Sequence, residues 1–206
     1  MTSGFFIAFE GGEGAGKSTQ AKKLADHLTS RGFRVVLTRE PGGTPTAEKI
    51  RAVLLDPSIT NMPDETEALL FAAARADHAT NLIRPAIEDG AIVICDRYIE
   101  SSVAYQGYGR DLGAEYIHSL STWATQGLLP DFTVYLDVPA DVSIERRVGT
   151  DRMELQSTTF HEQVQQAFRT IAELSTRQHV VIDATLPIDE IAQTIAHAVQ
   201  TALDSR

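Results

Sequence analysis

Residues 11–18 of the chain read Gly-Gly-Glu-Gly-Ala-Gly-Lys-Ser, which is a complete G-x-x-x-x-G-K-[ST] pattern. The apolar run from Phe5 to Phe9 precedes this stretch and predicts a buried strand. After it, small and apolar residues share one face of a helix that we expect to begin near Lys17, namely Ala21, Leu24, Ala25 and Leu28. A strand, a glycine-rich loop and a helix in this order predict a phosphate-binding loop. A chance glycine-rich turn is the alternative, but the whole motif and both flanks would then have to agree by accident.

Each part of this loop has a chemical role in the expected nucleotide site. Backbone N–H groups wrap a β-phosphate, and the helix N-terminus adds positive potential. The Lys17 ammonium reaches the β- and γ-phosphates, while the Ser18 hydroxyl is placed to bind Mg²⁺. The residues expected to bind ATP are Gly11, Gly12, Glu13, Gly14, Ala15, Gly16, Lys17, Ser18 and Thr19.

Length and charge limit the class of protein. The 206 residues suit one α/β domain spanning 1–206, and 43% hydrophobic residues can fill a sizeable core. The formal net charge of −10 argues against a nucleic acid polymer or an anionic membrane as partner, because both require a basic surface. A small phosphorylated ligand is compatible with this charge if arginines gather locally.

Cysteine and histidine usage narrows the chemistry further. Cys95 is the only cysteine, so an internal disulfide and a cysteine zinc site are excluded, and its apolar surroundings predict a packed strand residue. No pair of the six histidines has the i, i+4 spacing of a metal-binding helix, so we expect no tightly bound transition metal. The N-terminus does not resemble a secretion signal, and no run is long enough to span a membrane, so we expect a cytoplasmic protein.

Five β-rich runs are separated by helical stretches, which predicts an α/β fold with a five-stranded parallel sheet flanked by helices. The runs are Phe5 to Phe9, Arg34 to Thr38, Ala91 to Cys95, Phe132 to Asp137 and His179 to Asp183. Ligands of such sheets bind beyond the carboxyl ends of the strands. The polar clusters that follow the strands are therefore the candidate site.

Two segments between the second and third runs have open interpretations. Residues 39–44 read Arg-Glu-Pro-Gly-Gly-Thr, and composition alone favours an ordinary loop before a helix over 47–55. A long helix is expected from Glu65 to about Ile83, with Phe71 and Arg75 one turn apart. This pair could stack on and hydrogen-bond a planar base, although core packing with a surface ion pair is equally compatible.

The third run ends in Asp96-Arg97-Tyr98, beside the expected phosphate loop. A carboxylate here usually supports the metal ion, and Arg97 can bridge phosphate oxygens; a capping Asp paired with Arg is the alternative. Polar side chains follow closely, namely Ser101, Ser102, Tyr105, Gln106 and Arg110. Trp123, in a helix expected from about 114 to 126, fits the core better than the site and is left unassigned.

Arginines cluster again after the fourth run. Arg146, Arg147 and Arg152 surround a Gly-Thr-Asp turn, which suggests a mobile cover over about 146–157. Cations that close over a transferring phosphoryl group stabilise its developing charge and exclude water. A solvated basic turn is the alternative interpretation.

Together these motifs resemble the bacterial thymidylate (dTMP) kinases of the nucleoside monophosphate kinase group. The resemblance covers nearly the whole chain. It rests on the phosphate loop, on Arg-Glu-Pro-Gly-Gly-Thr at 39–44, on Asp-Arg-Tyr at 96–98 with Tyr-Gln-Gly at 105–107, and on Asp151-Arg152. It implies the P-loop kinase fold with a short arginine-bearing lid, transfer of the ATP γ-phosphoryl to dTMP with Mg²⁺, and a homodimer.

The resemblance also implies roles for single residues. Glu13 would contact the acceptor sugar, Pro41 and Phe71 would pack on thymine, and Arg75 would hydrogen-bond the base. The implied dTMP-binding set is Glu13, Arg39, Pro41, Phe71, Arg75, Arg97, Ser102, Tyr105 and Gln106, with Tyr105 crowding the ribose 2′ position. Catalysis would fall to Lys17, Arg97, Arg147 and Arg152, and the metal would be held by Ser18 and Asp96.

Two rival functions stay open on the sequence. A deoxynucleoside kinase also uses a phosphate loop and an arginine-bearing strand end, but its hydroxyl acceptor needs a carboxylate base. A nucleotide-dependent switch would need only one phosphate site, whereas this chain offers a second set of arginines. Turnover with and without an added nucleoside monophosphate distinguishes the three.

Overall fold

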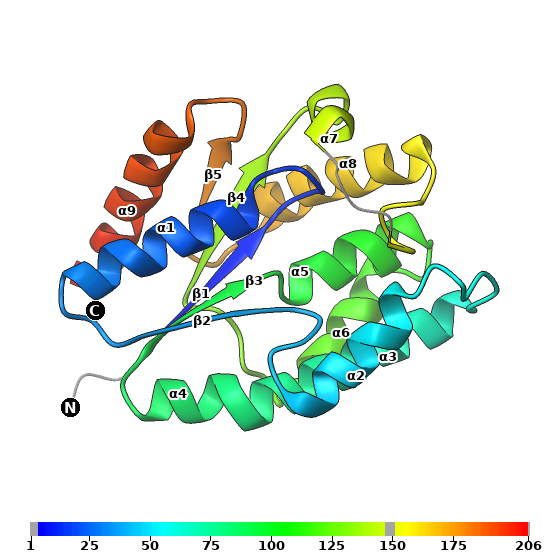
Figure 1. Cartoon of the computed structure of the whole chain (residues 1–206), viewed down its shortest axis with the longest axis horizontal. Coiled ribbons are helices and arrows are strands. Elements are labelled where there is room, and N and C mark those ends of the chain that lie inside the picture. The colour runs from blue at the N-terminus through cyan, green and yellow to red at the C-terminus, as the bar shows by residue number, and fades with distance from the viewer. Residues whose placement is uncertain (1–3, 147–150, 206) are drawn as a thin grey trace.

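A computed structural model of the protein describes residues 4–146 and 151–205. Its sheet has the strand order β2-β3-β1-β4-β5, and each neighbouring pair is parallel (Figure 1). The strands are β1 (Phe5–Glu10), β2 (Val35–Arg39), β3 (Ile92–Asp96), β4 (Phe132–Asp137) and β5 (His179–Asp183). The prediction of a five-stranded parallel sheet is confirmed, with shifts of one residue at the ends of the first three strands.

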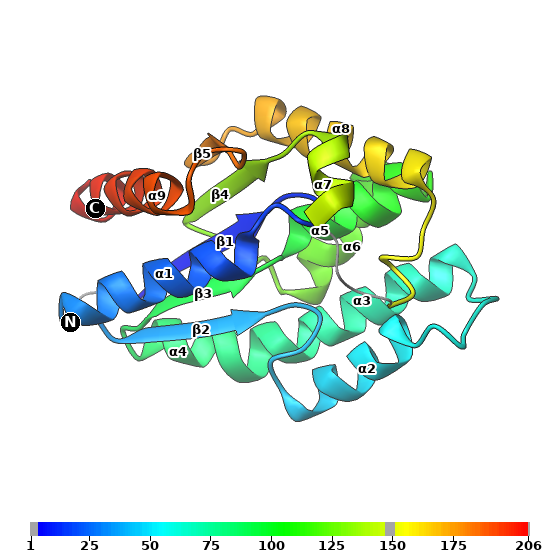
Figure 2. The same cartoon turned by 45° about the horizontal axis from the view of Figure 1, so that its top comes forward.

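Every side chain of β1 is buried, because helices cover both faces of the sheet. Phe5, Ile7 and Phe9 pack in one core with residues of α1 (Lys17–Ser30) and α9 (Ile188–Asp204). Phe6 and Ala8 point the opposite way, into a second core. This alternation is the period of two expected of a strand, and it explains why the sequence of a fully buried strand is continuously apolar. Figure 2 shows α1 and α9 side by side on one face.

The remaining elements enclose the second face and the strand ends. They are α2 (Pro45–Leu55), α3 (Asp64–His78), α4 (Arg84–Glu88), α5 (Ile99–Ser102), α6 (Ala114–Ala124), α7 (Ala140–Arg146), α8 (Thr158–Leu174) and the π-helical segments η1 (Ala79–Ile83) and η2 (Val103–Gly109). The Thr44 side chain caps α2 by accepting a hydrogen bond from the Ala47 N–H. The single helix predicted from residue 65 to about 83 corresponds to α3 together with η1, which continues it.

One expected core residue is on the surface. The Trp123 side chain is 79% exposed, so the preference for a core position, stated from the sequence, is wrong. The buried stripe of α6 is formed by Ile117, Ser121 and Ala124, and Trp123 lies off that stripe. Among the described helices, none combines the length and the hydrophobicity required to cross a bilayer.

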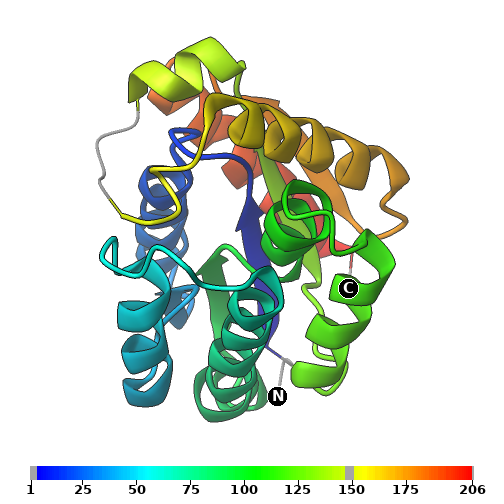
Figure 3. The same ribbon diagram turned by 90° about the vertical axis from the view of Figure 1, so that its right-hand side faces the viewer.

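In Figure 1 the chain leaves the carboxyl ends of β1, β2 and β3 towards the right-hand side, which faces the viewer in Figure 3. The phosphate loop leaves β1 there, and Glu40 and Arg97 follow β2 and β3 at the same edge. Residues far apart in the chain thereby come together.

Candidate active site

A cavity of about 210 Å³ lies at this edge of the sheet. Its walls bring together residues from four segments that the sequence analysis singled out: Glu13, Lys17, Ser18, Arg39, Pro41, Phe71, Arg75, Asp96, Arg97, Ser102, Tyr105 and Gln106. The phosphate loop, the two strand ends and α3 thus face one space. That space can hold a phosphorylated ligand next to the loop and a planar group farther in.

The loop backbone takes conformations that glycine favours. Gly14 and Gly16 have φ of 68° and 83°, and a Cβ on Gly14 would meet the Ser143 carbonyl oxygen at 2.8 Å. The Lys17 ammonium donates to the Gly12 carbonyl at 2.6 Å and is buried. Burial, followed by the positive charge of Arg97, lowers the pKa of Lys17 to about 8. A phosphate in the loop would supply the anion that this buried cation favours.

Ser18 and Asp96 form a direct contact in which the Ser18 hydroxyl donates to Asp96 Oδ2. The other carboxylate oxygen, Oδ1, is buried without a hydrogen-bond partner among the described residues. A buried carboxylate oxygen normally has a partner. Oxygen donors of this kind suit Mg²⁺, so the residues present fit the predicted metal ion.

Arg97 lines the cavity and has an unusual backbone conformation. Its φ of 71° is rare for a non-glycine residue, and the backbone is held on both sides. The Arg97 N–H donates to the Phe9 carbonyl at 2.9 Å, and the Tyr98 N–H donates to Glu10 Oε1 at 2.8 Å. The Arg97 guanidinium contacts Gly11 O, Ser101 Oγ, Glu13 Oε1 and Tyr105 Oη.

Two glutamates near Arg97 have opposite electrostatic environments. Burial raises the pKa of Glu13, but Arg97, Lys17 and the Tyr105 hydroxyl outweigh it and lower that pKa to about 2. Glu10 is fully buried, and its burial together with the nearby Glu100 raises the pKa of Glu10 to about 8. Glu13 is therefore an anion, whereas Glu10 is largely neutral at pH 7.

Arg75 is held in place by residues from several elements. Its Nε donates to Glu40 Oε2 at 2.7 Å, Nη1 to the Ser102 and Ser121 hydroxyls, and Nη2 to the Tyr98 carbonyl. Arg75 and Glu40 are both only 3% exposed in their side chains, so this ion pair is buried and not on the surface. Of the five N–H groups of the guanidinium, one is left without a partner among the described residues.

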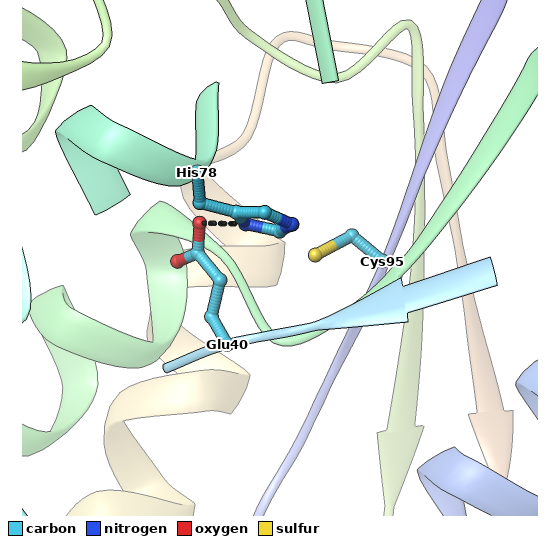
Figure 4. A group of neighbouring side chains, drawn as sticks. All are labelled: Glu40, His78 and Cys95. Atoms are coloured by element: carbon cyan, nitrogen blue, oxygen red, sulfur yellow. Dashed lines mark hydrogen bonds and ion pairs between the residues drawn. The ribbon is translucent and has the colours of Figure 1, made fainter. Parts of the chain in front are cut away.

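Behind Glu40 lies the group shown in Figure 4, in which Glu40, His78 and Cys95 face one another. These three residues are close enough to hold a metal ion. However, His78 already contacts Glu40 Oε1 at 3.0 Å and the Thr38 hydroxyl at 2.8 Å, while the Cys95 thiol donates to the Arg97 carbonyl. Hydrogen bonds therefore already occupy these side chains. His78 helps to hold Glu40 in place, and Glu40 in turn holds Arg75.

This arrangement of a phosphate loop beside an arginine-lined pocket agrees with the comparisons of the chain with known proteins. The family model described as thymidylate kinase matches residues 9–195. The chain belongs to the thymidylate kinase family. A thymidylate kinase of Geotalea daltonii is 44% identical over 206 residues, which cover 95% of this chain and 96% of the relative. One of Symbiobacterium thermophilum is also 44% identical, covering 98% and 95%.

A solved structure gives the same family and the same fold. The crystal structure of the thymidylate kinase from Ehrlichia chaffeensis superimposes with a TM-score of 0.79 at 33% sequence identity, covering 96% of this chain and 99% of that one. The resemblance and the P-loop kinase fold stated from the sequence motifs are confirmed.

The lid of this thymidylate kinase family member differs from the expectation. Arg152 is only 8% exposed and is absent from the cavity wall. Its Nη1 donates to Glu67 Oε2 at 2.6 Å and its Nε donates to the Leu54 carbonyl at 2.8 Å. The structure thus places Arg152 in a buried ion pair and not beside the phosphate loop, because Glu67 offers a buried carboxylate that the spacing of the motif does not reveal. Its neighbours Asp151, Met153 and Glu154 do line the cavity.

Of the other two arginines expected in the lid, Arg146 lies within the described residues and Arg147 does not. Arg146 donates to the Ala184 carbonyl at 2.8 Å. Arg147 lies outside the described residues, as do the other members of the segment 147–150. The catalytic role expected of Arg147 therefore stays a prediction.

Arg51 is a cavity residue that the sequence reasoning missed. It lines the cavity from α2 and donates to the Pro41 carbonyl at 2.8 Å. Arg39 donates to the same carbonyl at 2.9 Å and pairs with Glu48. The sequence contained an indication of this position, because Glu48 and Arg51 are three residues apart in a helix that directly follows the Arg-Glu-Pro-Gly-Gly-Thr turn.

Proposed function

We propose that this member of the family is a dTMP kinase, which transfers the γ-phosphoryl group of ATP to dTMP and produces dTDP and ADP. The observation that carries the proposal is a single cavity whose wall includes the phosphate loop together with Arg97, Arg75 and Phe71. A transferase needs donor and acceptor next to each other, whereas a nucleotide switch needs only the donor site.

The donor end has the groups that ATP requires. The backbone of 11–16 would surround the β-phosphate, and Lys17 would neutralise the β- and γ-phosphates. Ser18 and Asp96 would hold Mg²⁺, which when bound supplies charge neutralisation between the phosphates.

The transfer needs little covalent help from the protein. The attacking phosphate oxygen of dTMP is already anionic, so no general base is required. Arg97 would orient this phosphate, and with Lys17 it would stabilise the charge that develops on the moving phosphoryl group. We assign a further cation to Arg147, in the lid.

The low pKa of Glu13 does not favour a deoxynucleoside kinase in which Glu13 is the base. A hydroxyl acceptor requires a carboxylate base with a pKa closer to the working pH. Glu13, the carboxylate next to Arg97 on the cavity wall, has a pKa of about 2 because of its cationic neighbours. It is therefore a poor proton acceptor and better suited to hold Arg97 or a sugar hydroxyl.

Four residues of the cavity wall have the chemistry of a base pocket. Phe71 and Pro41 offer apolar surfaces, and Arg75 and Gln106 offer polar groups. Ser102 and Arg39 complete the acceptor side. Tyr105 packs beside Arg97 at the level where the sugar would lie, which would disfavour an added 2′-hydroxyl.

We further propose that the enzyme is a homodimer. Large apolar side chains are exposed on two helices of the surface, Leu69 on α3 and both Tyr116 and Trp123 on α6, with exposed fractions of 57%, 66% and 79%. Exposed aromatic residues of this size support a protein contact.

The acceptor panel tests the proposal. Steady-state ADP release would be measured with ATP and Mg²⁺ and with dTMP, dUMP, dCMP, dAMP or thymidine as acceptor. We expect the highest kcat/KM for dTMP, a lower value for dUMP and almost no activity with the others. Thymidine outperforming dTMP would establish the deoxynucleoside kinase instead, and ATP turnover that no acceptor raises would establish the switch.

A further inference from the structure

Glu67 is a buried carboxylate on α3 whose partners are Gln106, which lines the cavity, and two arginines that do not, Arg110 and Arg152. It is 1% exposed and is not part of the cavity wall. Its Oε1 accepts from Gln106 Nε2 at 2.9 Å and from Arg110 Nε at 3.2 Å. Its Oε2 accepts from Arg110 Nη2 at 3.1 Å and from Arg152 Nη1 at 2.6 Å.

This environment keeps Glu67 ionised. Burial raises the pKa of Glu67, but hydrogen bonds from Arg110 and Gln106 outweigh it and lower that pKa. Two guanidinium groups therefore face one permanent anion. An ionised carboxylate accepts hydrogen bonds and donates none.

The ionised Glu67 carboxylate determines how the side-chain amide of Gln106 is oriented. An amide can be turned by 180° so that its NH₂ group and its oxygen exchange places, and the hydrogen-bond partners decide which orientation is adopted. Next to an ionised carboxylate only the NH₂ group can face Glu67. Because Gln106 lines the cavity and Glu67 does not, the carbonyl oxygen is the amide atom left for the ligand.

We infer that Glu67 is a positioning residue that determines base specificity, by holding the Gln106 amide so that its carbonyl oxygen faces the acceptor base. This inference rests on the proposed function and adds to it a residue outside the cavity. A base that presents an N–H at its Watson–Crick edge, as thymine and uracil do at N3, can donate to that oxygen. Cytosine presents a bare N3 there, so two acceptors would face each other without a proton between them.

Gln106 and Arg75 would recognise different atoms of the base. Arg75 would recognise the carbonyl group next to N3, whereas Gln106 would recognise the N3 proton. Arg75 has one N–H without a partner among the described residues, so its share of the discrimination rests on one hydrogen bond. A second polar contact to the same edge would multiply the discrimination.

The test removes the carboxylate and measures the choice between bases. In Glu67→Met the Gln106 amide can turn freely, so we expect the ratio of kcat/KM for dCMP to that for dTMP to rise about tenfold, the effect of one hydrogen bond. The ratio for dUMP to dTMP should stay as in the wild type, because both bases carry the N3 proton. Arg110→Gln is the matched control: it removes a partner of Glu67 but leaves the amide contact, so its dCMP to dTMP ratio should stay low.

A second variant keeps the test valid if Glu67→Met does not fold. Gln106→Met removes the carbonyl itself while Glu67 keeps its two arginines, and it should raise the dCMP to dTMP ratio by a similar factor. An unchanged ratio in whichever of the two variants folds would overturn the inference, and so would an equal rise in Arg110→Gln.

Calorimetric binding of dTMP and dCMP separates this inference from the proposed function. If the wild type binds dTMP in preference to dCMP but transfers no phosphoryl group, the proposed function fails while the binding ratio of the variants still decides the role of Glu67. If the wild type binds both nucleotides equally, the inference itself is wrong.

Discussion

The Arg97 guanidinium donates to Glu13 Oε1 at 2.6 Å, so the cation expected to hold the acceptor phosphate is already paired with a carboxylate of the phosphate loop. Arg97 also contacts the Gly11 carbonyl and the Ser101 and Tyr105 hydroxyls, in a planar fork fixed from several sides. A point charge cannot reproduce that fork.

Arg97→Lys should therefore lower kcat/KM for dTMP by about a hundredfold, because a bidentate contact to phosphate is lost while positive charge is kept. The KM for ATP should change much less. Steady-state kinetics with each substrate varied in turn measures both. Arg34→Lys, at an exposed ion pair with Asp89, is the matched control and should leave the kinetic constants unchanged. Wild-type kinetics in Arg97→Lys would show that Arg97 does not bind the acceptor.

The pKa of Lys17 predicts a pH dependence of nucleotide binding. In the ligand-free protein this pKa is about 8, and an adjacent phosphate favours the ammonium form. ATP binding near pH 8 should therefore take up protons, and ATP affinity should fall as the pH rises above about 8. Calorimetry in buffers of different ionisation enthalpy measures the uptake between pH 7.5 and 9.

Lys17→Met supplies the control for this effect. The variant should bind ATP more weakly and lose the proton uptake, and its kcat should fall by about a hundredfold or more. Uptake that persists in the variant would mean that another group titrates.

Glu10 predicts a pH dependence of stability. Its pKa is about 8 in the folded protein and near the ordinary value of 4.5 when unfolded. Below pH 4.5 both states are protonated, so Glu10 adds no penalty there. Between about 4.5 and 8 the unfolded state ionises first, so the free energy of unfolding should decrease with rising pH, by a few kcal/mol in total.

Glu10→Gln should flatten this slope, because the neutral amide matches the protonated acid in shape. Urea unfolding of both proteins at pH 5, 6, 7 and 8 measures the difference. Glu173→Gln replaces an exposed glutamate and should keep the wild-type slope. Parallel curves for wild type and Glu10→Gln would contradict the assignment.

Arg152→Met should chiefly reduce stability. Removing one partner of a buried ion pair leaves a poorly compensated charge, here softened because Arg110 still faces Glu67. We expect a loss of about 2 kcal/mol or more in the free energy of unfolding. Arg34→Met, at an exposed pair, should change it by less than about 1 kcal/mol. A large fall in kcat at unchanged stability would show instead that Arg152 acts on the phosphates.

The sequence by itself determined the sheet, the phosphate loop and most of the cavity wall. Those features are written in short stretches: a buried strand such as β1 is continuously apolar, and the loop needs glycine where φ is positive. The rule that ligands bind at the carboxyl ends of parallel strands then placed Asp96, Arg97 and the turn at 39–44 on one edge.

Only the tertiary structure decided the partners of the charged side chains and the exposure of Trp123. Arg152 and Glu67 are 85 residues apart in the chain, and Arg75 and Glu40 are 35 apart. Whether an arginine faces a phosphate or a buried carboxylate depends on which helices pack together, since charges interact through space and not along the sequence. The orientation of the Gln106 amide is decided in the same way, by a glutamate 39 residues earlier.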